Sequence, residues 1–244
     1  LRWHRAPASL LRMAKRAAQE EVRHTRVTRR LAKRYGATAK AASVRSLPVR
    51  SLLSLAIENV QEGCVRETFG VLVGRWQALH AADPAIRRAM WRIARDEGRH
   101  AALSWQVARW VHGQLSVDAQ AQVEQAKRQA IETLRAELQN EPEAPLVRLA
   151  GLPRAAEALR LGEERLQNAS HRAGDVRFQF AAGRAEAVDD RDRLLVGPLG
   201  ALFAEPDSAT NALLCQSGIA FRKACGITTP IRLVQQIGLR GLDL

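Results

Sequence analysis

Apolar residues recur every three or four positions over most of residues 1–166, and valine and isoleucine never cluster into the alternating pattern of a strand. Alanine, leucine, arginine, glutamate and glutamine, which favour helices, dominate the composition. The pattern therefore predicts an all-α protein. Its expected helices cover residues 8–35, 50–81, 84–113, 118–138, 145–150 and 153–166.

The turn between the second and third expected helices has its own sequence signal. Ala82-Asp83-Pro84 offers an aspartate that can cap a helix and a proline that suits its first turn. Because so short a turn reverses the chain, the segments 50–81 and 84–113 are expected to pack antiparallel. Ser116 or Asp118 is expected to cap the next helix.

Two Glu-x-x-His motifs stand out for their chemistry. Glu21-Val22-Arg23-His24 lies in the first expected helix and Glu97-Gly98-Arg99-His100 in the third. Residues three apart on a helix point the same way, and both pairs fall on the apolar stripe of their helix, so each offers a carboxylate and an imidazole to the core. One such motif alone is best explained as a surface charge pair or a hydrogen-bonded core histidine. Two on facing stripes favour metal ligands, because burying unpaired charge costs several kcal/mol.

The segment 50–81 supplies further candidate carboxylates. Glu58 and Glu62 lie on its apolar stripe, whereas Glu67 lies on a neighbouring one. If the hairpin is symmetric about residue 83, Glu62 lies about seven residues, or roughly 10 Å, from the level of Glu97, whereas Glu67 lies nearly level with it. The stripe therefore favours Glu62, and the hairpin geometry favours Glu67.

The run Arg95-Asp96-Glu97-Gly98-Arg99-His100 resembles the last metal-binding helix of the ferritin-like di-iron carboxylate proteins, which include the small subunit of ribonucleotide reductase. Glu62-Gly63 is similar to their preceding ligand helix, at nearly the same distance from the Glu-x-x-His motif. Residues 8 to about 167 look most like a group of bacterial ferritin-like domain proteins.

This resemblance implies a ferritin-like antiparallel helical bundle whose cofactor is a carboxylate-bridged pair of iron ions, or of manganese ions. The implied metal ligands are Glu21, His24, Glu62, Glu97 and His100, with Asp96 as the partner of a histidine ring nitrogen and Glu58 and Glu67 as reserve ligands. The expected partners are these metal ions and dioxygen or peroxide, in oxidase, oxygenase or peroxidase chemistry with an unspecified substrate. The alternative is a non-enzymatic metal-binding, storage or interaction bundle.

The resemblance also implies four core helices that carry, in order, a lone Glu, Glu-x-x-His, a lone Glu and Glu-x-x-His. The Glu21 motif would be the second of these, yet only residues 1–7 precede its helix, and they contain no acid. The first core helix is therefore missing here and is expected upstream in a longer chain. The groove that it leaves would be covered by residues 118–138, covered by a second copy in a homo-oligomer, or left open.

The positive charge of the chain is concentrated in its first fifth. Residues 1–50 hold 14 lysines and arginines against two acids, whereas the rest of the chain is nearly neutral. A solvated outer helix face explains this pattern better than phosphate binding, so nucleic acid is not an expected partner. No run of 18 apolar residues occurs, so no membrane span is expected. No signal peptide is visible, and the localisation stays open.

The periodic pattern ends near residue 167. Residues 1–167 are expected to form the bundle, including an additional C-terminal helical segment. Residues 168–244 have mixed charge and scattered glycine and proline, which predicts a poorly structured extension. Within it, residues 208–224 have the pattern of one helix.

Overall fold

The computed structural model describes residues 1–37 and 49–171. These residues form helices and turns with no strand, so the predicted all-α class is confirmed. The elements are α1 (Ala8–Arg34), α2 (Leu52–Glu58), the π-helix η1 (Asn59–Glu67), α3 (Thr68–His80), α4 (Pro84–His112), α5 (Val117–Leu138), α6 (Ala144–Ala150) and α7 (Ala155–His171). Apart from the last four residues of α7, the extension predicted for 168–244 lies outside the described residues.

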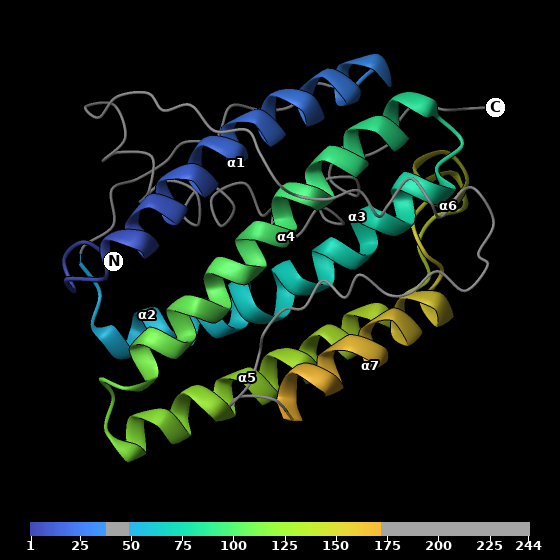
Figure 1. Cartoon of the computed structure of the whole chain (residues 1–244). Coiled ribbons are helices and arrows are strands. Elements are labelled where there is room, and N and C mark those ends of the chain that lie inside the picture. Colours follow the sequence, from blue (N-terminus) through green and yellow to red (C-terminus); the bar gives the residue numbers. More distant parts are fainter. Residues whose placement is uncertain (38–48, 172–244) are drawn as a thin grey trace, which may run out of the picture.

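The long helix α4 runs through the middle of the molecule (Figure 1). It packs against α1 on one side and against η1 and α3 on another, while α5 and α7 lie beyond η1 and α3. Contacts of Glu20 with His100 and of His24 with Asp96 make α1 antiparallel to α4. The turn at residues 81–83 makes α3 antiparallel to α4 as well, so α1 and α3 run parallel.

The helix starts follow the predicted capping signals. Asp83 caps α4 by accepting a hydrogen bond from the Ala85 backbone N–H at 2.7 Å, and Pro84 opens the helix. Tyr35 donates a hydrogen bond to the same Asp83 carboxylate at 2.5 Å, which ties the end of α1 to the start of α4 and lowers the pKa of Asp83. Of the two caps proposed for α5, Ser116 is the one observed.

Three apolar clusters form the core of the part of the chain that the structure describes. The first joins η1 and α3 to α5, α6 and α7 around Phe69 and Leu134. The second joins the N-terminal half of α4 to α1 and α6 around Met90. The third joins the C-terminal half of α4 to α1 and α2 around Leu10 and Val107. The second and third clusters leave the middle of the α1–α4 interface between them for polar side chains.

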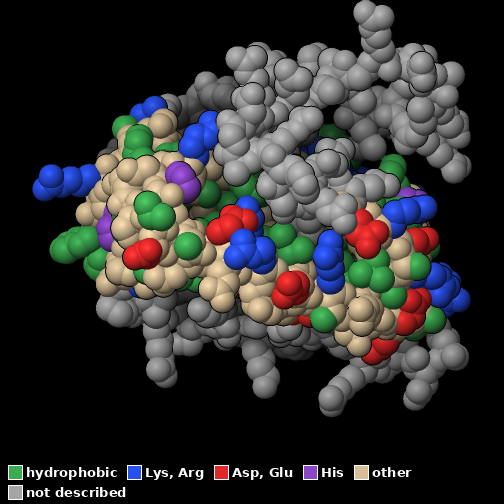
Figure 2. All heavy atoms as spheres, turned by 90° about the horizontal axis from the view of Figure 1, so that it is seen from below, with side chains coloured by type: hydrophobic (Ala, Val, Ile, Leu, Met, Phe, Trp, Pro, Cys, Tyr) green, Lys and Arg blue, Asp and Glu red, His purple; other side chains and the backbone are tan. Residues whose placement is uncertain are grey.

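The surface carries charges of both signs. On the face that Figure 2 shows, which lies over α5 and α7, acidic and basic side chains are intermixed. The exposed cations of α1 are Arg12, Arg23, Arg26, Arg29, Arg30, Lys33 and Arg34. Of the α1 arginines, Arg16 and Arg23 contact the buried Glu20. Among the described helices, none combines the length and the apolar character needed to cross a membrane.

The helix η1 approaches α4 closely at Gly63. A Cβ atom at this position would collide with the Oγ and Cβ atoms of Ser104 on α4. Asn59 of η1 also donates a side-chain hydrogen bond to the Ser104 carbonyl at 2.9 Å. A residue without a side chain is therefore needed at position 63 for this packing.

We expect Gly63→Ala to lower the stability of the protein by about 1–3 kcal/mol, because the added methyl group forces η1 and α4 apart. The matched control is Gly98→Ala on α4, where a Cβ atom would meet nothing within 4 Å. That control should raise stability by up to about 1 kcal/mol through helix propensity. Thermal unfolding followed by circular dichroism measures both, and equal melting temperatures for the two variants would contradict the packing argument.

Candidate metal centre

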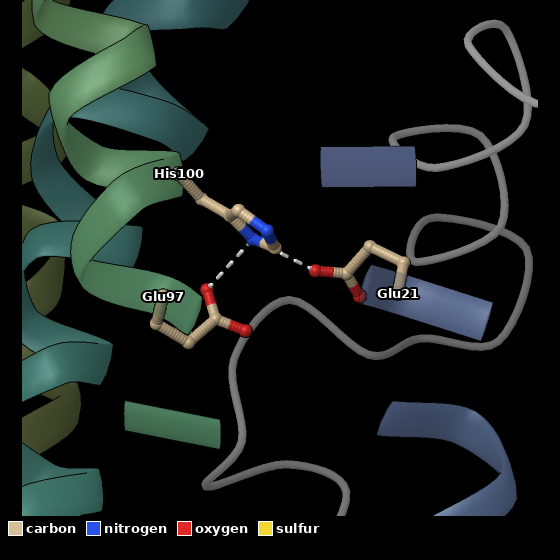
Figure 3. Close-up of side chains that lie close together, drawn as sticks. All are labelled: Glu21, Glu97 and His100. Atoms are coloured by element: carbon tan, nitrogen blue, oxygen red, sulfur yellow. Dashed lines mark ion pairs between the residues drawn. The ribbon is translucent and has the colours of Figure 1, made fainter. Parts of the chain in front are cut away.

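Both Glu-x-x-His motifs lie at the same level of the α1–α4 interface. Glu21 and His24 extend from α1, while Glu97 and His100 extend from α4. His24, Glu97 and His100 are buried, and Glu21 is partly buried. In Figure 3 the carboxylates of Glu21 and Glu97 point at the imidazole of His100 from the two helices. The sequence motifs thus meet in space.

The inner atoms of these four residues converge. Nδ1 of His100 lies 3.1 Å from Oε1 of Glu21 and 3.5 Å from Oε2 of Glu97. Nδ1 of His24 lies 3.6 Å from the same Glu21 oxygen and 3.4 Å from Oε1 of Glu97. Each oxygen of Glu97 therefore faces a different histidine, whereas one oxygen of Glu21 faces both.

The inner nitrogens of both histidines lack a hydrogen bond. Nδ1 of His24 and Nδ1 of His100 are buried and have no hydrogen-bond partner of acceptable geometry in the described part of the chain. Ligand atoms of Glu21, Glu97 and His100 lie within 4.8 Å of one another, so these residues could hold a metal ion. Buried polar atoms are nearly always satisfied, and a metal ion would satisfy these.

The outer nitrogens of both histidines are held by carboxylates from the opposite helix. Nε2 of His24 lies 3.1 Å from Oδ2 of Asp96, and Nε2 of His100 lies 2.9 Å from Oε2 of Glu20. Such outer contacts fix the ring orientation and direct Nδ1 inward, as is usual for histidines that bind metals. Asp96 therefore contacts a histidine ring nitrogen from the opposite helix.

Glu20 is the site residue that the sequence analysis missed. It is only 1% exposed and contacts His100 together with Arg16 and Arg99. Burial raises its pKa, but these donors outweigh burial and lower it to about 2. A signal for it was present, because Glu20 precedes Glu21 as Asp96 precedes Glu97.

The carboxylates also set the charge of the histidines. Burial lowers the pKa of His24, but Asp96, Glu21 and Glu97 outweigh it and raise the pKa to about 10. Burial likewise lowers the pKa of His100. The carboxylates of Glu20, Glu21 and Glu97 outweigh burial and raise this pKa well above its usual value. Without a metal ion, both imidazoles therefore carry a second proton at neutral pH and balance part of the surrounding negative charge.

The three carboxylates predicted from residues 50–81 lie outside this cluster. Glu58 forms an ion pair with Arg50. Glu62 is partly exposed and lies near Arg66, which makes two 2.8 Å hydrogen bonds to Glu137 of α5. The structure does not bring Glu62 to the clustered ligand atoms, and its assignment as a ligand stays a prediction.

Glu67 contacts α4 beside the cluster. Ser104 donates a 3.1 Å hydrogen bond to Oε2 of Glu67, and Ser104 lies one turn beyond His100. Because Gly63 faces Ser104 and the helices are antiparallel, Glu67 is level with His100. Of the carboxylates on η1, Glu67 is therefore the one placed at the level of the site.

Comparisons of the chain with protein-family models, with curated proteins and with solved structures gave no match. The function is therefore argued from the site. Two imidazole nitrogens and two carboxylates converge in a buried layer, and each imidazole is oriented from behind by another carboxylate. This arrangement can hold divalent metal ions through nitrogen and oxygen ligands.

Metal binding should release protons. A metal ion needs the free electron pair of Nδ1, yet the raised pKa values keep both imidazoles protonated at neutral pH. We expect about two protons to be released when both histidines bind metal at pH 7, and the affinity to fall as the pH is lowered. Calorimetric cobalt titrations in buffers of different ionisation enthalpy measure the proton count. Binding without proton release would show that these histidines are not ligands.

Proposed function

We propose that this chain is a ferritin-like metalloprotein that binds two iron ions, or two manganese ions, between α1 and α4 and reacts with dioxygen or peroxide. One observation carries the proposal. The Nδ1 atoms of His24 and His100 are buried, face Glu21 and Glu97, and lack a hydrogen-bond partner among the described residues. Coordination to metal would satisfy both nitrogens.

The types of ligand support iron or manganese. Imidazole nitrogen and carboxylate oxygen together suit these ions, whereas sites rich in thiolate favour zinc or iron–sulfur clusters. Two facing carboxylates also supply negative charge that offsets part of the positive charge of divalent cations in a buried place. Bound in their reduced state, the metal ions would supply the electrons that reduce the oxidant.

The arrangement of the carboxylates supports two ions rather than one. The two oxygens of Glu97 face different histidines, at 3.4 Å from His24 and 3.5 Å from His100. Oε1 of Glu21 lies near both histidines. Glu21, His24, Glu97 and His100 would therefore hold the two ions.

The helix order supports a ferritin-like bundle. A helix with Glu-x-x-His, α1, runs parallel to α3, and α3 forms a hairpin with α4, which carries the second Glu-x-x-His. Consecutive long helices that run parallel need a long connection, and one such connection is typical of ferritin-like folds. The apolar clusters around Met90 and Leu10 close both ends of the site and would limit the entry of water.

A structural ion-pair cluster is the competing function. The pKa values of His24 and His100 are raised, so the buried carboxylates already have protonated partners without any metal. Such a bundle would serve as an interaction module and would catalyse no oxidation of iron. Metal analysis of the purified protein, followed by addition of ferrous iron in air, separates the two functions. A di-iron protein oxidises iron catalytically, whereas an ion-pair cluster leaves the rate of iron oxidation equal to that in buffer alone.

The metal should depend on the buried histidines. We expect His24→Ala and His100→Ala each to weaken iron binding by more than about tenfold, because each removes a ligand. The matched controls are His80→Ala and His112→Ala, since both of these histidines are exposed and lack a glutamate three residues earlier. Iron content after gel filtration measures all four. Equal iron in the four variants would refute the site.

The third carboxylate is proposed to come from η1. Glu67 is favoured by its contact with Ser104 at the level of His100, whereas the resemblance to ferritin-like proteins favours Glu62. We expect Glu67→Gln to reduce the number of bound metal ions, with Glu62→Gln as the matched control of the same chemistry. Metal stoichiometry at saturation measures the effect. Loss of an ion in Glu62→Gln alone would assign the ligand to Glu62 instead.

A further inference from the structure

The two motifs share more than glutamate and histidine. Each reads acid, glutamate, any residue, arginine, histidine: residues 20–24 are Glu-Glu-Val-Arg-His and residues 96–100 are Asp-Glu-Gly-Arg-His. Because α1 and α4 are antiparallel, the first acid of each motif reaches the histidine of the other. The arginine of each motif, Arg23 or Arg99, then lies beside both first acids.

Arg99 joins the two outer carboxylates. Its Nη2 atom lies 2.6 Å from Oε1 of Glu20 and also contacts Oδ1 of Asp96. The other oxygen of each acid holds a histidine: Oε2 of Glu20 contacts His100, and Oδ2 of Asp96 contacts His24. One guanidinium group is therefore linked to both imidazoles, each through a single carboxylate.

We infer that Arg99 is a positioning residue that fixes both histidines of the proposed metal centre at once. The inference rests on the proposed function. A carboxylate held at only one oxygen can rotate about its side chain, whereas one held at both oxygens keeps its histidine partner in a single orientation. Charge-assisted hydrogen bonds are the strong ones, so the guanidinium is suited to this role. Outer partners of this kind commonly change metal affinity by ten- to a hundredfold, in order of magnitude.

Arg23 occupies the equivalent place in the other motif with looser contacts. Its Nη2 atom lies 3.4 Å from Glu20 and 3.6 Å from Asp96, and its side chain is 54% exposed, against 30% for Arg99. Ion pairs of exposed side chains contribute little. Arg16 also holds Oε1 of Glu20, at 3.0 Å, but Arg99 is the arginine that closely contacts both outer carboxylates. The positioning of both histidines therefore falls mainly on Arg99, and Arg23 provides an internal comparison.

Cobalt binding to the full chain tests the inference. The variant Arg99→Met keeps an unbranched stem and removes the guanidinium, and Arg99→Lys keeps a charge but lacks the planar fork. The controls are Arg23→Met and Arg92→Ala, the latter an exposed arginine elsewhere on α4. The titration gives the affinity, and visible absorption at saturating cobalt reports the arrangement of ligands around the metal.

We expect both Arg99 variants to bind cobalt about tenfold or more weakly, with an altered visible spectrum even when the site is full. Arg92→Ala should match the wild type, and Arg23→Met should change the affinity less than either Arg99 variant. A merely structural ion pair would lower the melting temperature and leave the spectrum of the saturated site unchanged.

The outcomes separate this inference from the proposed function. If a folded Arg99 variant has the affinity and spectrum of Arg92→Ala, the positioning role is refuted, while the metal centre stands. If the wild-type chain binds neither cobalt, iron nor manganese, the proposed function is refuted and the inference falls with it.

Discussion

Three carboxylates and two imidazoles are buried at one level of the α1–α4 interface, with the half-buried Glu21 beside them, and the rest of the structure satisfies this constraint. Any of these groups left without a partner would cost several kcal/mol. The solution is reciprocal: Glu20 of α1 holds His100 of α4, and Asp96 of α4 holds His24 of α1. A shift of one helix past the other by a single residue would break both contacts. Apolar clusters at either end tolerate small shifts better, so the polar layer specifies the register.

The π-helix η1 supports this layer from the other side of α4. Its close approach at Gly63 brings Asn59 to the Ser104 carbonyl and Glu67 to the Ser104 hydroxyl, which also contacts the His100 carbonyl at 3.0 Å. The turn of α4 that follows His100 therefore packs against η1. Extended π-helices are rare and are frequently found at functional sites. Here a nine-residue example contacts α4 at Ser104, one turn beyond His100.

The features that could be predicted from the sequence are those set by local chemistry. Helix starts at Pro84 and Val117 follow from Asp83 and Ser116, and both motifs were assigned to inward faces from apolar periodicity alone. The acid before each motif glutamate marks Glu20 as a candidate, but its partner depends on which residue of α4 comes opposite, and no local pattern gives that partner. The π-helix likewise changes which residues of η1 share a face, and a stripe counted at the α-helical period does not include that change. Register and helix distortion arise from packing between elements far apart in sequence.

The spacing of atoms within the cluster bears on whether it holds protons or metal. Ligands about 2.1 Å from an ion lie about 3.0 Å apart at right angles and about 3.6 Å apart when the angle widens to roughly 120°. The four inner nitrogen–oxygen distances, from 3.1 to 3.6 Å, fall in this interval. A cluster built only for ion pairing would use both ring nitrogens in hydrogen bonds of acceptable geometry. Among the described residues, the outer nitrogens do so and the inner ones do not. That asymmetry supports the proposed metal site, because the inner nitrogens face the space that Glu21 and Glu97 share.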